Sequence, residues 1–158
     1  TAVLNKFSGT GNCRISKGLR LRISKIPPNI LYLGASKKRV YRIKDAHTGD
    51  PAWEEITGFL PTIFPSQGNV SCIAIDPYDA DEVFIVFSNY RTYSIYQSKD
   101  AGQSWIKVAG NLEANTAGTL EGPSCRWLEI LPLADKKAYI LVQDAEEKHS
   151  FDRLRLNS

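Results

Sequence analysis

Apolar residues in this chain form short runs that are separated by clusters of proline, asparagine, aspartate and glycine. In the middle of the sequence, four such runs follow one another, and Val, Ile, Tyr and Phe dominate them, at 70–75, 83–88, 92–98 and 104–108. Residues of these types favour β-strands, and no run shows the 3.6-residue period of a helix. The intervening segments are short enough for hairpins. The pattern therefore predicts antiparallel β-strands.

The pattern of runs repeats along the chain. Three similar apolar segments, I-L-Y-L-G-A-S (30–36), V-F-I-V-F-S (83–88) and A-Y-I-L-V-Q (138–143), start at intervals of 52 and 55 residues when Leu31, Val83 and Ala138 are aligned. Trp53 and Trp105 are also 52 residues apart, and similar octets follow both of them. A fixed period of this size is the signature of a repeat architecture.

Four antiparallel strands in a unit of this length are typical of a β-propeller blade. A sandwich or a β-solenoid is the alternative. The predicted fold is all-β, a partial propeller of about three blades. The predicted units are the outer strand of a preceding blade with its connection (1–19), blade 1 (20–58), blade 2 (59–110) and blade 3 without its outer strand (111–158).

The predicted blades do not fill a ring. Thr1–Val3 aligns with 54–56 and with 106–108, which directly follow the two aligned tryptophans. Propellers typically have four to eight blades. We therefore expect the remaining blades to come from a longer parent protein or from a partner chain that completes the ring.

The octet S-K-D-A-G-Q-S-W (98–105) lies between the predicted third and fourth strands of blade 2. A hairpin turn leaves backbone amides unpaired, and Ser and Asp side chains satisfy such amides locally. Glycine takes the positive φ that the turn needs, and the tryptophan packs on the hairpin. The first unit has a longer turn at the same place, K-D-A-H-T-G-D-P-A-W (44–53).

This octet resembles the Asp-box, the bacterial neuraminidase repeat S/T-x-D-x-G-x-T/S-W. The matching residues are Ser98, Asp100, Gly102, Ser104 and Trp105, with Asp45, Gly49 and Trp53 in the looser first turn. The wider unit is most similar to the repeats of large secreted bacterial propeller proteins with sorting domains, and relatives include sialidases, xyloglucanases and sortilin-type propellers. The resemblance implies a secreted or extracytoplasmic propeller in which the box ties a turn on the face opposite the ligand site.

On the ligand face, candidate binding residues combine aromatic rings with cations. They are Tyr90, Arg91 and Tyr93 in a turn of blade 2, and Arg126 beside Trp127 at the start of an inner strand of blade 3. Such a composition suits sugar or protein surfaces. The alternative is structural: the tyrosines pack between blades and Arg126 pairs with a carboxylate.

Two function classes follow. The first is a non-enzymatic propeller platform that binds protein or glycan as part of a larger secreted protein. The second is a fragment of a glycoside hydrolase, xyloglucanase-like or sialidase-like, with its catalytic residues mostly outside this chain. Y-R-I-K (41–44) lacks the proline of the sialidase F/Y-R-I-P motif. Xyloglucanase-type hydrolysis needs two facing carboxylates, and Asp79, Asp81 and Asp135 belong to turns on the opposite side. We therefore assign no catalytic residue.

Composition argues against several classes of binding partner. The chain of 158 residues carries a net charge of +3, from 20 basic and 17 acidic side chains, without a long basic run, which argues against nucleic acid. No apolar run is long enough to span a membrane. Cys13, Cys72 and Cys125 have no C-x-x-C spacing, and His47 and His149 are isolated. We therefore expect no metal site and no cofactor.

Overall fold

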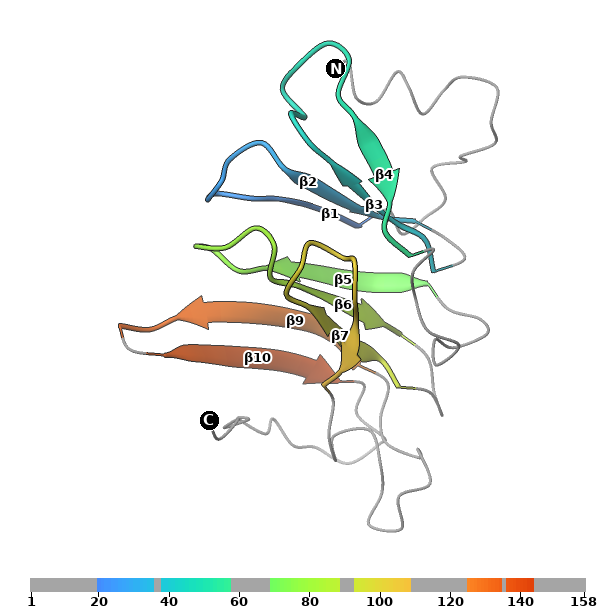
Figure 1. The fold of residues 1–158 in the computed structure, drawn as a ribbon. Helices are drawn as coiled ribbons and strands as arrows, with labels where there is room; N and C mark the ends of the chain where they lie inside the picture. Colours follow the sequence, from blue (N-terminus) through green and yellow to red (C-terminus); the bar gives the residue numbers. More distant parts are fainter. Residues whose placement is uncertain are drawn as a thin grey trace.

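The computed structural model describes residues 20–35, 38–57, 69–88, 93–108, 125–134 and 136–143 (Figure 1). These residues form β-strands and turns, and they contain no helix. The predicted all-β class is confirmed for this part of the chain. None of these residues belongs to a helix that is long and apolar enough to cross a membrane.

The first two sheets share one plan. Each has four antiparallel strands that lie beside one another in sequence order. The strands of the first sheet are β1 (Arg20–Ile23), β2 (Leu31–Gly34), β3 (Val40–Ile43) and β4 (Trp53–Glu55). The strands of the second sheet are β5 (Val70–Ile75), β6 (Val83–Phe87), β7 (Ile95–Ser98) and β8 (Ile106–Lys107). The four expected runs of the middle unit are therefore present, with shorter third and fourth strands.

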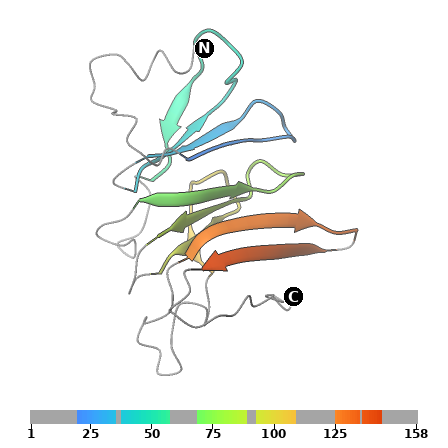
Figure 2. The ribbon, with the colours of Figure 1, turned by 180° about the vertical axis from the view of Figure 1, so that it is seen from behind.

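The third sheet consists, in the described residues, of the antiparallel pair β9 (Cys125–Pro132) and β10 (Lys137–Gln143). The three sheets follow one another face against face, with the second sheet in the middle (Figures 1 and 2). Burial on both faces explains why β6 reads V-F-I-V-F without a polar residue. No closed sheet forms among the described strands.

The sequence repeat is also a repeat of backbone contacts. Equivalent amides and carbonyls of the first two sheets, 52 or 55 residues apart, make equivalent hydrogen bonds. The pairs of bonds are Ser24 N–Ile30 O with Asp76 N–Glu82 O, Ala46 N–Asn29 O with Ala101 N–Asp81 O, and Ile56 N–Val40 O with Val108 N–Ile95 O. The two four-stranded sheets are therefore copies of one structural unit.

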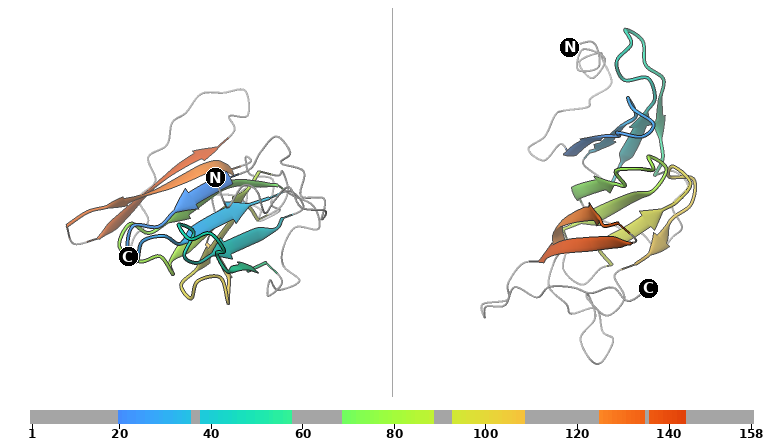
Figure 3. Two further views of the ribbon diagram at one scale, coloured as in Figure 1. Left: turned by 90° about the horizontal axis from the view of Figure 1, so that it is seen from above. Right: turned by 90° about the vertical axis from the view of Figure 1, so that its left-hand side faces the viewer.

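Adjacent sheets meet most closely at their first strands. β1 contacts β5, and β5 contacts β9, while β2 contacts β5 and β6 contacts β9. The right-hand view in Figure 3 shows the three sheets following one another. One apolar core lies between the first and second sheets, around Tyr32, Ile73 and Ile85. A second core lies between the second and third sheets, around Cys72, Phe84 and Leu128.

The alignment of the third repeat is wrong by one residue on β10. It places Ile140 on Ile85, which is fully buried in the first core, yet 48% of Ile140 is exposed. The residues of β10 that pack toward the second sheet are Tyr139 and Leu141. Side chains alternate between the two faces of a strand, so a shift of one position exchanges the faces.

Candidate functional site

The turn at 98–105 is closed by its own side chains. The Ser98 hydroxyl accepts a hydrogen bond from the Gly102 amide at 2.7 Å and donates to Oδ1 of Asp100 at 2.8 Å. Ser104 donates its amide to Oδ1 of Asp100 at 2.8 Å and its hydroxyl to Oδ2 at 2.5 Å. These bonds, the one from the Ser104 hydroxyl first, hold the pKa of Asp100 below its ordinary value. The carboxylate of Asp100 is thus occupied within the turn.

The same turn also touches the neighbouring sheet. Only 6% of Trp105 is exposed, and its indole N–H points at the carbonyls of Gly102, at 3.1 Å, and of Ile56, at 3.4 Å. Gly102 has a φ of 92°, and a Cβ at this position would lie 2.6 Å from Cδ1 of Ile56. Ile56 directly follows β4, so the turn of the second sheet packs on the end of the first.

The looser turn of the first sheet closes differently. Asp45 has a φ of 52°, and its carbonyl accepts bonds from the amide and the hydroxyl of Thr48, both at 2.9 Å. A Cβ at Gly49 would meet no atom within 4 Å. The ring of Trp53 lies 5.4 Å from that of Tyr41, and 54% of Trp53 is exposed. The backbone carbonyl of Asp45 therefore accepts both of the bonds from Thr48 that close this turn.

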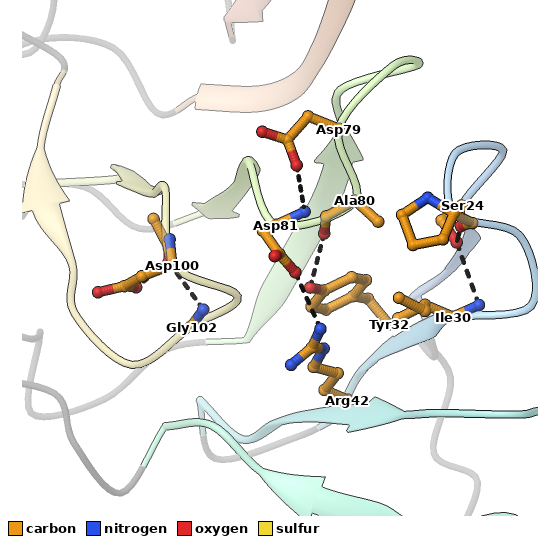
Figure 4. Close-up of polar contacts among 11 residues, drawn as sticks. Ser24, Ile30, Tyr32, Arg42, Asp79, Ala80, Asp81, Asp100 and Gly102 are labelled. Atoms are coloured by element: carbon orange, nitrogen blue, oxygen red, sulfur yellow. Dashed lines mark hydrogen bonds and ion pairs between the residues drawn. The ribbon is translucent and has the colours of Figure 1, made fainter.

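Polar contacts join the first sheet to the turn between β5 and β6 (Figure 4). The Tyr32 hydroxyl donates to the Ala80 carbonyl at 2.8 Å, and Arg42 pairs with Asp81 at 2.9 Å. Asp79 accepts the Asp81 amide at 3.0 Å. Burial raises the pKa of Tyr32 to about 12, so it stays a neutral donor. The aspartates of this turn are therefore engaged in structural contacts.

An ion pair network with two buried carboxylates joins the second and third sheets. Asp76, almost fully buried, accepts the amides of Tyr78 and Asp79 on Oδ1. Nζ of Lys137 lies 2.6 Å from Oδ2 of Asp76 and forms an ion pair with it. Lys137 also pairs with Glu82. Desolvation lowers the pKa of Lys137, but the two carboxylates outweigh it and raise that pKa overall.

These contacts connect two sheets and do not form a metal centre. The side-chain amide of Gln97 donates to Glu82 at 2.7 Å, and Lys137 contacts both carboxylates, so protein groups already occupy them. No group of three or more candidate metal ligands occurs within the described ranges.

Arginines of β1 cover the free edge of β5. Nε of Arg20 donates to the Ser71 carbonyl, and Nε of Arg22 donates to the Ile73 carbonyl at 3.1 Å. Both carbonyls belong to β5, the first strand of its sheet, which pairs with β6 on one edge and with no other described strand on the other. Guanidinium groups therefore satisfy backbone acceptors that would otherwise be unpaired.

Arg22 reaches further, to the third sheet. Its guanidinium lies 3.3 Å from Oε2 of Glu129 and 4.7 Å from the centre of the Trp127 ring. Trp127 is 39% exposed, and both charged side chains are partly open to solvent. We call Arg22, Trp127 and Glu129 the first-strand cluster. It gathers an aromatic ring, a cation and a carboxylate from two sheets at one place.

The predicted binding residues are only partly brought together. Tyr90 and Arg91 lie outside the described residues. Tyr93 packs against the first core, and Nζ of Lys107 lies 3.9 Å above its ring. Arg126 is exposed on β9, next to Trp127 of the first-strand cluster.

Sequence reasoning missed Arg22. Its side chain meets Glu129 across 107 positions of the chain, which no local pattern reveals. One signal was available: Arg20 and Arg22 alternate with Leu21 and Ile23 in a strand whose equivalents in the other units are more apolar.

Comparison of the chain with protein-family models and with curated protein sequences gives no match. The resemblance to the Asp-box therefore rests on the motif residues, and the turn geometry around Asp100 describes what those residues do here.

Proposed function

We propose that the chain contributes about three blades to a secreted or extracytoplasmic β-propeller of the Asp-box type, and that it binds a glycan without catalysing a reaction. The blade interpretation is supported by the two equivalent four-stranded sheets and by the approach of the first strands to one another. In a propeller, the first strands surround the central axis. The first-strand cluster would then lie at the mouth of the central channel.

The observation that carries the binding function is the composition of this cluster. Trp127 offers an exposed ring, Arg22 lies over it, and Glu129 is held beside both. The apolar faces of sugar rings pack on aromatic rings, and sugar hydroxyls hydrogen-bond to carboxylates and guanidinium groups.

The state of the carboxylates supports binding rather than hydrolysis. Asp76, Asp79 and Asp100 accept backbone amides within their own turns. Glu82 and Glu129 are held in ion pairs with Lys137 and Arg22. Glycoside hydrolysis needs an acid and a second carboxylate on either side of one sugar bond, and no such pair is formed by these groups. The hydrolase-fragment alternative has no observation of its own.

The test is binding of the purified chain to a panel of neutral and acidic oligosaccharides, followed by titration calorimetry on the hits. Trp127→Ala should weaken binding about tenfold or more, as removal of a central aromatic contact does. Trp53→Ala removes another exposed tryptophan and should leave affinity within about twofold. Mass spectrometry of the incubated sugars should show them unchanged.

Three outcomes would contradict the proposal. Cleaved sugars would favour the hydrolase. Equal effects of the two tryptophan variants would remove the first-strand cluster from the binding site. Failure of every glycan to bind, with a protein ligand depending on Trp127, would replace the glycan by a protein surface.

A further inference from the structure

The third sheet exposes an apolar face on the side away from the second sheet. Leu128 and Ile130 of β9 point into the second core, so Leu131 lies on the opposite face. On β10 the same alternation places Ile140 and Val142 outward. Leu131, Ile140 and Val142, which we call the tail face, are all more than one-third exposed.

The first sheet exposes apolar residues at the other end of the succession. Arg20 and Arg22 point toward β5, so Leu21 and Ile23 point away from the second sheet. They are 49% and 60% exposed. Leu21 and Ile23, which we call the head strand, form the open part of this face, since Leu31 and Leu33 of the neighbouring strand are already buried.

The second sheet shows what covers residues at the head-strand positions. Ile23 pairs with Leu31 as Ile75 pairs with Val83, so Leu21 is equivalent to Ile73. Ile73 is buried and Ile75 is partly buried, both against the core that the preceding sheet supplies. The head strand therefore carries side chains that suit the same packing. In the first sheet these side chains are exposed.

The tail face, in turn, resembles the surface on which a first strand packs within the chain. At the junction between the second and third sheets, the second sheet offers apolar residues of its first two strands to the first strand of the next sheet, as Cys72 and Phe84 do toward Leu128. The tail face presents Leu131 from β9 and Ile140 and Val142 from β10, the first two strands of the third sheet. Its chemistry suits another first strand.

We propose that a second copy of this chain binds the tail face through its head strand, so that the first sheet of one copy follows the third sheet of another. The contact is heterologous, because two different surfaces meet, and it continues the packing between sheets within the chain. It lies beside the proposed glycan site, because Val142 pairs with Trp127 and Ile140 pairs with Glu129 between β10 and β9, so a bound copy and a glycan would share this face.

The experiment measures the mass of the full chain by sedimentation velocity over a wide concentration range. The parent should show species heavier than the monomer of 17.6 kDa, and their share should grow with concentration. Ile140→Lys on the tail face and Ile23→Lys on the head strand should each weaken association about tenfold or more, because a charge would be buried in an apolar contact. Tyr78→Lys changes an exposed residue of the middle sheet and should associate like the parent.

Mixing the two variants decides the orientation. A copy with Ile23→Lys keeps its tail face, and a copy with Ile140→Lys keeps its head strand, so an equimolar mixture should form a dimer of one of each and nothing larger. Circular dichroism of each variant checks that it is folded. Leu21→Glu and Val142→Glu replace any variant that is not.

The proposal fails if the parent remains a monomer at every concentration. It also fails if Ile23→Lys associates like the parent while Ile140→Lys does not, since the tail face would then bind itself. A mixture of the two variants that stays monomeric would equally overturn it.

Discussion

The turns at 44–53 and 98–105 occupy the same place in two equivalent sheets, yet they are stabilised differently. Both donate an amide to the carbonyl of the first turn in their own sheet, from Ala46 and from Ala101. The side chains of Ser98 and Asp100 close the second turn, whereas the first turn is closed on the Asp45 carbonyl by the amide and hydroxyl of Thr48. The tryptophan of the second turn is buried, whereas Trp53 is more than half exposed.

The difference shows that the backbone conformation of this turn does not require the side-chain bonds of Ser98 and Asp100. In both sheets the turn is connected to the turn between the first two strands by a backbone hydrogen bond, from Ala46 or from Ala101. Burial of the tryptophan depends on the preceding sheet, because Trp105 packs on Ile56. The residue aligned with Ile56 for the first turn is Val3, which lies outside the described residues.

The largest expected difference between the two turns concerns the tryptophans. Trp105→Ala removes a buried ring and should lower the free energy of unfolding by about 3–5 kcal/mol. Trp53→Ala removes a half-exposed ring and should cost about 1 kcal/mol or less. Urea titration followed by circular dichroism measures both. Losses of equal size would mean that the two turns are energetically alike.

The glycines should differ next. Gly102→Ala places a Cβ against Ile56 at a positive φ and should cost about 2–3 kcal/mol. Gly49→Ala meets open space at a φ outside the left-handed region and should change stability by no more than about 1 kcal/mol, in the stabilising direction. Thermal unfolding of both variants beside the parent tests the pair, and a destabilised Gly49→Ala would show that the first turn is tighter than its contacts indicate.

The aspartates should show the smallest contrast. Asp100→Ala removes two acceptors from the turn and should cost about 1 kcal/mol, since water replaces part of the bonding at the exposed Ser104. Asp45→Ala should cost about 0.5 kcal/mol or less, because the acceptor that closes that turn is the Asp45 carbonyl, which alanine keeps. The same urea titration measures both, and a larger loss for Asp45→Ala would reverse the comparison.

The pH dependence sharpens the role of Asp100. Its pKa is lower in the folded protein than in the unfolded chain, so its stabilising contribution is fully present above the ordinary aspartate pKa of about 3.9. The contribution is lost as the pH falls through the lower native value. The stability difference between the parent and Asp100→Asn should therefore shrink in acid. A difference that stays constant down to about pH 2 would show that the charge of Asp100 plays no part.

The third repeat shows how far a sequence pattern reaches. A-Y-I-L-V-Q predicts a strand, and β10 is one. The pattern does not say which alternate residues face the second sheet, because nearly every position is apolar. Packing against Cys72 and Phe84 selects Tyr139 and Leu141 for the inner face and leaves Ile140 outside.

What the sequence determined by itself is local. Apolar runs with turn residues between them define strands and hairpins, and the 52-residue spacing defines the repeated unit, since both depend on neighbouring positions and on the alternation of side chains. Only the tertiary structure decided which faces are buried, why Trp105 and not Trp53 is covered, and that Arg22 meets Trp127 and Glu129. These properties arise between sheets, where residues far apart in the chain meet and one sheet excludes water from the next.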